Sequence, residues 1–296
     1  MRCAAGQGTC QHPNRPVPYL LNSAPGRLHR APLAFAHRGA DPARENTMGA
    51  FHRAVALGFR YLEIDVRTSS DGRLVIFHDE TLERVTNGAG RLSDHTWDQL
   101  SRLRVTSSVE ADPTDTTSPG AAEPLVLFEE ALVAFPDTHF NVDLKDKEAA
   151  AHFAEIVDRL GAHHRVLATS FKDSRRHHLN HLLAQPVATS GGWTSVALMV
   201  LLGPLGGFRR ISRRIARIDC VQVPIRHTRI PIVRPKFVRR CHRAGLQVHV
   251  WVVDDPVEMH RLLDIGVDGI MTDDAEALAG VMRQRSVWPQ TDSQPL

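Results

Sequence analysis

The stretch that decides the fold is YLEIDV, residues 61–66, in which apolar side chains alternate with the carboxylates of Glu63 and Asp65. This alternation is typical of a β-strand whose two faces meet different surroundings, because successive side chains of a strand point in opposite directions. A second stretch, HFNVDLK at residues 139–145, places Asp143 and Lys145 on one face in the same way. Each stretch is therefore expected to be a strand whose charged side chains point to the same side.

Outward from these two strands, short apolar runs alternate with helix-like stretches. Strands are expected to begin near Leu33, Tyr61, His139, Arg165, Pro186, Cys220, Gln247 and Asp268. Eight strands separated by helices, with short connections in the second half, favour a closed parallel barrel over an open doubly wound sheet. No GxGxxG sequence follows the first strand, so a dinucleotide-binding fold is not indicated. The predicted fold class is α/β, a (β/α)8 TIM barrel.

The barrel is predicted to occupy residues 31–285. Residues 1–30 are rich in Pro, Gly, Asn and Arg without periodicity, so we expect a poorly ordered tail there, and residues 286–296 are expected to form a C-terminal tail. A small insertion after the second barrel strand is expected at about residues 79–124, where the pattern weakens and Ser, Thr, Pro, Asp and Glu become frequent. A hairpin strand at residues 74–77 precedes it.

Composition narrows the function. The chain is 42% hydrophobic and 23% charged, as expected of a soluble globular protein. The formal net charge of +3 is small and the basic residues are spread along the chain, so nucleic-acid binding is not indicated. No apolar segment before Pro13 indicates a secretory signal, and the longest apolar run, residues 195–208, is shorter than the about 20 residues that span a bilayer. We therefore expect a cytoplasmic protein, and no obligate protein partner is evident.

Polar residues lie where the predicted strands end, which is where a (β/α)8 barrel carries its active site. These residues are three carboxylates, two histidines and two cations: Glu63, Asp65, Asp143, His37, His78, Arg38 and Lys145. Alternate positions on a strand set two side chains about 7 Å apart on one face, a spacing that can clasp a hard cation. Oxygen ligands favour Mg²⁺ or Ca²⁺ over zinc. Each residue alone is explained by an ordinary structural role, whereas their joint placement at strand ends favours a functional site.

The motifs occur in the order found in a known family. AHRGA at residues 36–40 and PARENT at 42–47 resemble the HRG and PENT opening of glycerophosphodiester phosphodiesterases, although Pro42 lies two residues further from Glu45 than usual. LEIDV (62–66), FHDETL (77–82) and RVTNG (84–88) are similar to the motifs that follow. NVDLK (141–145) resembles a later N-x-E-x-K strand, with Asp143 in place of the commoner Glu. VWVVD (250–254) and GVDGIMTD (266–273) are similar to the last two strands, so the resemblance covers roughly residues 31–285.

This resemblance implies a metal-dependent phosphodiesterase that hydrolyses glycerophosphodiesters to sn-glycerol 3-phosphate and an alcohol. It implies that Glu63, Asp65 and Asp143 hold a divalent cation, Mg²⁺ or Ca²⁺, while His37 and His78 form the acid/base pair. Such chemistry is physically consistent, because phosphodiester cleavage requires charge neutralisation and two proton transfers. Which histidine is the acid, and whether water or a hydroxyl of the substrate attacks, both remain open.

Four further residues have expected supporting roles. Arg38 and Lys145 would neutralise the phosphate charge. Glu45 would orient Arg38 or complete the metal shell, with a helix-start role as the alternative. Trp251 would wall the glycerol pocket, with a place in the core as its alternative.

Two other functions compete with this prediction. The apolar run at residues 196–208 follows the fifth strand, and it is either an ordinary packed helix or a surface that accepts an acyl chain or touches a membrane. The second interpretation would make the protein a lysophospholipase D-like enzyme that acts on lysophospholipids. A barrel that has lost catalysis and only binds a ligand would need a broken site, yet every acid/base and charge-neutralising position is filled.

Overall fold

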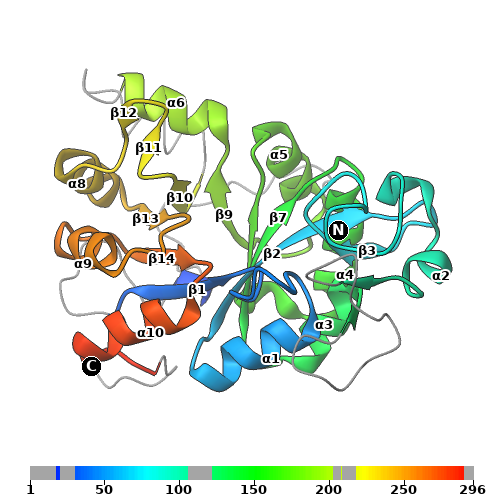
Figure 1. The fold of residues 1–296 in the computed structure, drawn as a ribbon. Coiled ribbons are helices and arrows are strands. Elements are labelled where there is room, and N and C mark those ends of the chain that lie inside the picture. Colours follow the sequence, from blue (N-terminus) through cyan, green and yellow to red (C-terminus); the bar gives the residue numbers. More distant parts are fainter. Residues whose placement is uncertain (1–17, 21–30, 106–121, 203–207, 209–217, 290–296) are drawn as a thin grey trace, which may run out of the picture.

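The computed structural model describes residues 18–20, 31–105, 122–202, 208 and 218–289. Within these ranges, eight parallel strands form a closed barrel (Figure 1). They are β1 (Leu33–His37), β2 (Tyr61–Thr68), β7 (His139–Leu144), β8 (Val166–Thr169), β9 (Ala188–Gly191), β10 (Cys220–Val223), β13 (Gln247–Val250) and β14 (Gly269–Thr272). Because β1 pairs with both β2 and β14, the eight parallel strands close on themselves, and the predicted TIM barrel is confirmed.

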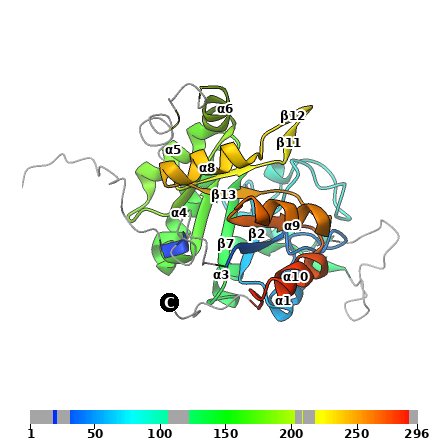
Figure 2. The same cartoon turned by 90° about the vertical axis from the view of Figure 1, so that its left-hand side faces the viewer.

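Helices surround the barrel (Figures 1 and 2). They are α1 (Met48–Leu57), α4 (Ala149–Leu160), α5 (Asp173–Leu182), α6 (Trp193–Leu202), α8 (Pro235–Ala244), α9 (Pro256–Asp264) and α10 (Ala275–Gln284). α1 begins at Met48, because the Thr47 side chain accepts a hydrogen bond from the Ala50 N–H and caps the helix. The helix expected in the apolar run is α6, which begins at Trp193; residues 203–207 of that run lie outside the described residues.

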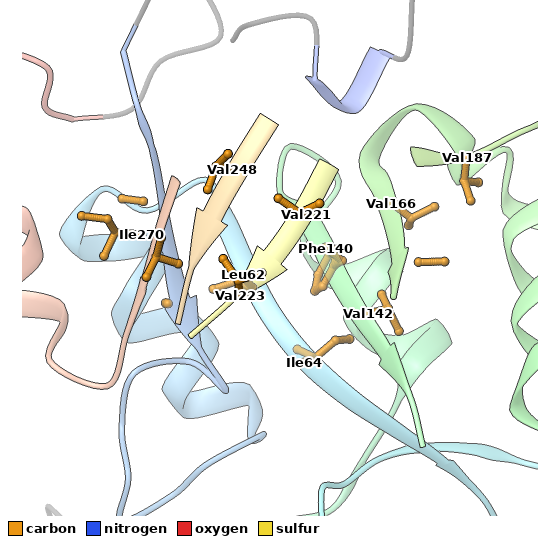
Figure 3. Packing of buried hydrophobic residues seen from close by; sticks show 14 of the residues in the cluster. Leu62, Ile64, Phe140, Val142, Val166, Val187, Val221, Val223, Val248 and Ile270 are labelled. Carbon is orange, nitrogen blue, oxygen red and sulfur yellow. The ribbon is translucent and has the colours of Figure 1, made fainter. Parts of the chain in front are cut away.

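The alternation along the strands separates an outer core from the barrel interior. Leu62 and Ile64 of β2 pack outward in a large cluster that includes Phe51 of α1 and Phe153 of α4. Figure 3 shows Leu62 and Ile64 among the equivalent residues of the neighbouring strands. The intervening residues of β2 must face the interior, since side chains of a strand alternate between its faces. Glu63 and Asp65 are thereby directed into the barrel by the same pattern that buries their neighbours.

Strand register brings the functional candidates together. His37 at the end of β1 lies beside Glu63 of β2, and Asp65 lies beside Asp143 of β7. His37 ends β1 and Asp143 lies one residue before the end of β7, whereas Glu63 and Asp65 lie within β2, which continues to Thr68. All of these strands run toward the same mouth of the parallel barrel. Side chains more than 70 residues apart in sequence are therefore neighbours.

The insertion begins as a hairpin on β2. β3 (Leu74–Ile76) pairs antiparallel with β2, and β6 (Val126–Leu127) pairs with β3 before α3 (Phe128–Ala134) leads back to the barrel. The other described elements of the insertion are η2 (Leu92–Asp94), α2 (Trp97–Leu100), β4 (Arg104–Val105) and β5 (Glu123–Pro124). Val75, Phe77 and Leu92 belong to a separate small core. An extra unit thus follows the second barrel strand as expected, and its residues 106–121 lie outside the described ranges.

Parts of both predicted tails pack against the barrel. η1 (Pro18–Leu20) lies at the floor, where the fully buried Tyr19 contacts Tyr61 edge-on at a ring-centroid distance of 5.5 Å. For these three residues the structure departs from the expected poorly ordered tail, because Tyr19 fills the apolar end of the barrel interior. At the other terminus, Trp288 packs on Phe59 and donates a hydrogen bond to the Leu57 carbonyl. Residues 1–17, 21–30 and 290–296 are not among those described.

Candidate active site

A tight turn after β1 positions the first two candidate residues. Arg38, Gly39 and Ala40 all have positive φ values, of 52°, 88° and 51°. A Cβ atom on Gly39 would lie only 2.6 Å from the Ala50 Cβ atom, so glycine is required there. Left-handed backbone at Arg38 and Ala40 is strained and is common at functional sites. The turn folds Arg38 back over the barrel mouth, where its N–H donates to the Glu63 carbonyl.

A pocket of about 240 Å³ opens at the carboxyl ends of the strands. Every predicted site residue except Glu45 lines it: His37, Arg38, Glu63, Asp65, His78, Asp143, Lys145 and Trp251. Glu45 lies just behind and accepts hydrogen bonds of 3.1 and 3.2 Å from Arg38 Nη1. The structure therefore brings the predicted residues together around one cavity, and their chemical roles remain predictions.

Two cations neutralise the most buried carboxylate of the pocket. Lys145 Nζ lies 2.8 Å from Asp65 Oδ1 and 2.6 Å from Asp143 Oδ2, while Arg38 Nε lies 3.0 Å from Asp65 Oδ2. Burial alone would raise the pKa of Asp65, but Lys145 and Arg38 outweigh that effect and lower the pKa to about 2. Asp65 is therefore ionised throughout the neutral range, at the centre of the site.

The other two carboxylates have oxygens without a hydrogen-bond partner. Glu63 Oε2 and Asp143 Oδ1 are buried and accept no hydrogen bond from any residue that the structure describes, although Glu63 Oε2 lies 3.7 Å from His37 Nε2, within ion-pair distance. Burial, followed by repulsion from Asp65, raises the pKa of Glu63 to about 7, and burial likewise raises the pKa of Asp143. Unpaired buried oxygens of this kind are costly and are the ligands that hard divalent cations use. The donor set therefore fits the chemistry of Mg²⁺ or Ca²⁺.

The oxygen atoms of these side chains suit a divalent cation, but their arrangement around Lys145 is less favourable to metal binding. Among the residues that the structure describes, no three His, Cys, Asp or Glu side chains are grouped so that they could hold a metal ion. Lys145 Nζ contacts both Asp65 and Asp143. A cation would therefore compete with Lys145 for these two carboxylates.

Each candidate histidine is paired with an aspartate through Nδ1. His37 Nδ1 lies 2.7 Å from Asp273 Oδ1, and His78 Nδ1 lies 2.5 Å from Asp79 Oδ1. A carboxylate partner fixes the tautomer of an imidazole and leaves Nε2 for proton transfer. Burial lowers the pKa of His78 below its usual value. Burial acts in the same direction on His37, but Glu63 and Asp273 outweigh it and raise the pKa.

A chain of ion pairs connects the two sides of the pocket. Arg84 donates to Glu45 at 2.6 and 3.0 Å and to Asp79 at 2.5 and 3.1 Å. Since Glu45 also binds Arg38 and Asp79 also binds His78, the turn after β1 is tied to the insertion. Arg84 thereby holds His78 and Arg38 in fixed relation.

Sequence reasoning assigned no role to several residues of the site. Phe171 and Trp193 line the pocket with Trp251, with ring centroids 6.1 Å apart in the first pair and 5.9 Å apart between Phe171 and Trp251. Each follows a barrel strand by two residues, which is the signal that could have identified them. Asp273 and Asp79 were present in the recognised motifs without an assigned role. Their partnership with the histidines depends on tertiary structure.

Comparison with known proteins identifies the family of this chain. A family model for the glycerophosphoryl diester phosphodiesterase family matches residues 37–277. The probable glycerophosphodiester phosphodiesterase 2 of Mycobacterium tuberculosis is 38% identical over 262 residues, which are 88% of this chain and 94% of the relative. A human lysophospholipase D is 26% identical over 295 residues, covering 86% of this chain and 89% of the human protein.

The fold also resembles a solved enzyme structure. A phosphodiesterase from Oleispira antarctica, determined in complex with the product sn-glycerol-3-phosphate, has a TM-score of 0.69 and 20% identity to this chain. The likeness covers 86% of this chain and 97% of that one. At this identity it supports the barrel fold alone.

Proposed function

Since the chain belongs to the glycerophosphoryl diester phosphodiesterase family, we propose that it hydrolyses glycerophosphodiesters to sn-glycerol 3-phosphate and an alcohol. The observation that carries the proposal is the meeting of two aspartate-paired histidines with Arg38 and Lys145 around one pocket. The cations match the charge of a phosphodiester, and the imidazoles match its two proton transfers.

The residues act in a division of labour. Arg38 and Lys145 draw the phosphodiester into the pocket and offset its negative charge. One of the histidines takes the proton of the attacking oxygen, which belongs either to water or to a neighbouring hydroxyl of the substrate, and the other gives a proton to the leaving alcohol oxygen. If the substrate hydroxyl attacks, water then opens the cyclic phosphate and completes the hydrolysis. Asp273 and Asp79 keep both rings oriented through Nδ1. Glu45 and Arg84 hold Arg38 and His78 from behind.

A divalent cation, Mg²⁺ or Ca²⁺, completes the proposal. Glu63, Asp65 and Asp143 would hold it, and it would supply further neutralisation of the phosphate and activation of the attacking oxygen. The two unpaired buried carboxylate oxygens support this assignment. Exchange of Lys145 contacts for metal contacts would accompany binding, because Lys145 shares two of the proposed ligands.

Lysophospholipids are the second candidate substrates. Phe171, Trp193 and Val196 give one side of the pocket an apolar lining that a glycerol group does not require. A relative of this chain is itself named a lysophospholipase D. An acyl-bearing substrate would place its chain along this side and its phosphodiester against the cations.

Release of glycerol 3-phosphate from glycerophosphocholine tests the proposal. We expect release with Mg²⁺ or Ca²⁺ and its loss after EDTA treatment, with recovery when the metal is restored. Lysophosphatidylcholine assayed in parallel separates the two substrate classes. Absence of glycerol 3-phosphate under both metals would overturn the proposed activity, and full activity in EDTA would overturn the metal assignment alone.

A further inference from the structure

The pocket opens beside a surface that combines exposed apolar side chains with cations. This rim patch consists of Trp193, Leu201 and Leu202 of α6 with Arg226, Arg229 and Ile230 of the hairpin formed by β11 (Arg226–His227) and β12 (Ile230–Pro231). Figures 1 and 2 both show α6 and this hairpin on the same upper side of the molecule. Trp193 and His227 join them directly, with ring centroids 4.9 Å apart.

Core packing does not account for the apolar half of the rim patch. The α6 sequence, WTSVALMVLL, has no charged residue, although only Ser195, Val196 and Met199 of it are buried. Leu201 is 71% exposed, Leu202 is 44% exposed and Ile230 is 59% exposed. A surface helix ordinarily turns polar residues to water, and contiguous exposed apolar groups mark contact with a partner or a membrane.

The charged half of the rim patch is positive and is not neutralised within the described ranges. Neither Arg226 nor Arg229 forms a salt bridge with any residue that the structure describes. Arg226 interacts electrostatically with Glu258, but Arg261 already donates hydrogen bonds of 2.5 and 2.7 Å to the two oxygens of Glu258. The cations of the hairpin are therefore available for an anionic surface.

We propose that the rim patch docks the protein on the surface of a bilayer that contains anionic lipids. Trp193, Leu201 and Ile230 would enter the interfacial layer, and Arg226 and Arg229 would lie against anionic head groups. Trp193 also lines the pocket, so docking would bring the pocket to the lipid surface. The consequence for catalysis rests on the proposed phosphodiesterase activity, because the docked pocket would receive a lipid head group while the acyl chain stays in the bilayer.

Vesicle co-sedimentation of the whole protein tests the docking. The probes are vesicles of phosphatidylcholine alone and vesicles in which part of it is replaced by phosphatidylglycerol. We expect binding to the anionic vesicles that weakens as salt is added, since exposed charges are screened. Arg226→Gln/Arg229→Gln should weaken this binding about 30-fold, because each arginine near an anionic surface contributes roughly a factor of five. Leu201→Gln should weaken it about tenfold.

Matched variants at the opposite end of the barrel serve as controls. Helices of this fold run antiparallel to the strands, so their last turns lie away from the mouth. Arg243 and Arg283 are exposed in the last turns of α8 and α10, and Arg243→Gln/Arg283→Gln removes the same charge. Val133, 66% exposed in the last turn of α3, matches Leu201 through Val133→Gln. Both controls should bind vesicles as the unaltered protein does.

The outcomes separate docking from catalysis. Leu201, Arg226 and Arg229 do not line the pocket, so their variants should cleave glycerophosphocholine at the unaltered rate. Equal vesicle binding by rim variants and controls, or no binding of the unaltered protein, would overturn the docking and leave the phosphodiesterase proposal standing. A concentration-dependent dimer that Leu201→Gln dissociates would assign the patch to a second copy instead. Vesicle binding without any hydrolysis would overturn the proposed phosphodiesterase activity and leave the docking proposal standing.

Discussion

The floor and the mouth of the barrel treat buried ionisable groups in opposite ways. At the floor, His249 is fully buried against Phe35 and its Nε2 lies 2.9 Å from Gln247 Oε1; burial lowers its pKa to about 3, so it is neutral. At the mouth, Asp65 is equally buried but is held ionised by Lys145 and Arg38. The buried histidine at the floor is uncharged, whereas the buried aspartate at the mouth is charged. Stability and chemistry therefore depend on different ends of one set of strands.

The largest expected effect is loss of activity at the mouth. His37→Ala or His78→Ala should lower kcat by about 10² to 10⁴, since each removes a proton-transfer group. Both side chains are partly exposed, so the free energy of unfolding should change little. Steady-state kinetics with urea unfolding measures both quantities.

His249→Ala is the matched variant at the floor, and it should lower stability while the folded fraction keeps its kcat. A variant of His37 or His78 with unaltered kcat would remove that histidine from the proposed mechanism.

The next largest effect is a loss of stability when the Tyr19 ring at the floor of the barrel is removed. Tyr19→Ala should lower the free energy of unfolding by about 3 kcal/mol, because it deletes a fully buried aromatic ring. Tyr19→Phe is the control, since the Tyr19 hydroxyl has no hydrogen-bond partner among the described residues and its loss should cost nothing. Urea unfolding of both variants measures the difference. If Tyr19→Ala were as stable as the unaltered protein, residues 18–20 would not be part of the folded unit.

The smallest effect is a pH dependence whose sign differs between the two ends. His249 has a folded pKa of about 3 against an ordinary value of 6.5, so between these values the unfolded chain binds more protons. Its contribution to stability is complete above pH 6.5 and falls as the pH is lowered, by at most about 1.4 kcal/mol per pH unit. His249→Phe should flatten this slope in urea unfolding experiments.

Glu63 provides the opposite slope in metal-free protein. Its folded pKa of about 7 lies above the ordinary 4.5, so the folded state binds more protons in that window and loses stability as the pH rises. Glu63→Gln should remove the loss. Equal slopes in the unaltered protein and in both variants would mean that neither buried group governs the pH dependence.

Much of the fold was predictable because the two faces of a strand produce an alternation of apolar and charged residues in the sequence. The residues Glu63 and Asp65 alternate with Leu62 and Ile64, and that pattern fixed both the strand and the direction of its charges. Position at a strand end then predicted that the polar residues would converge, and the register places His37 beside Glu63 and Asp65 beside Asp143.

The remainder depended on contacts that leave no periodic pattern. Tyr19 lies in a segment without periodicity, yet it docks in the floor because the barrel leaves an apolar space there. Phe171 lies in a connection and Trp193 is the first residue of α6, and the direction of both side chains is set by the tertiary fold. The bridging of Asp65 and Asp143 by Lys145 could not be read from spacing, because the same spacing serves an ion pair and a metal site.

The register of β2 has a consequence for how the protein acquires its activity. A slip of β2 by one residue would reverse its faces, pressing Glu63 and Asp65 into the helices and exposing Leu62 and Ile64 to the cavity. That state would bury two unpaired carboxylates in an apolar layer, so it is strongly disfavoured. The residues that disfavour the misaligned strand are thus the ones that are proposed to hold the metal ion. The one register of β2 beside β7 that buries Leu62 and Ile64 is therefore also the register that places Glu63 and Asp65 in the cavity.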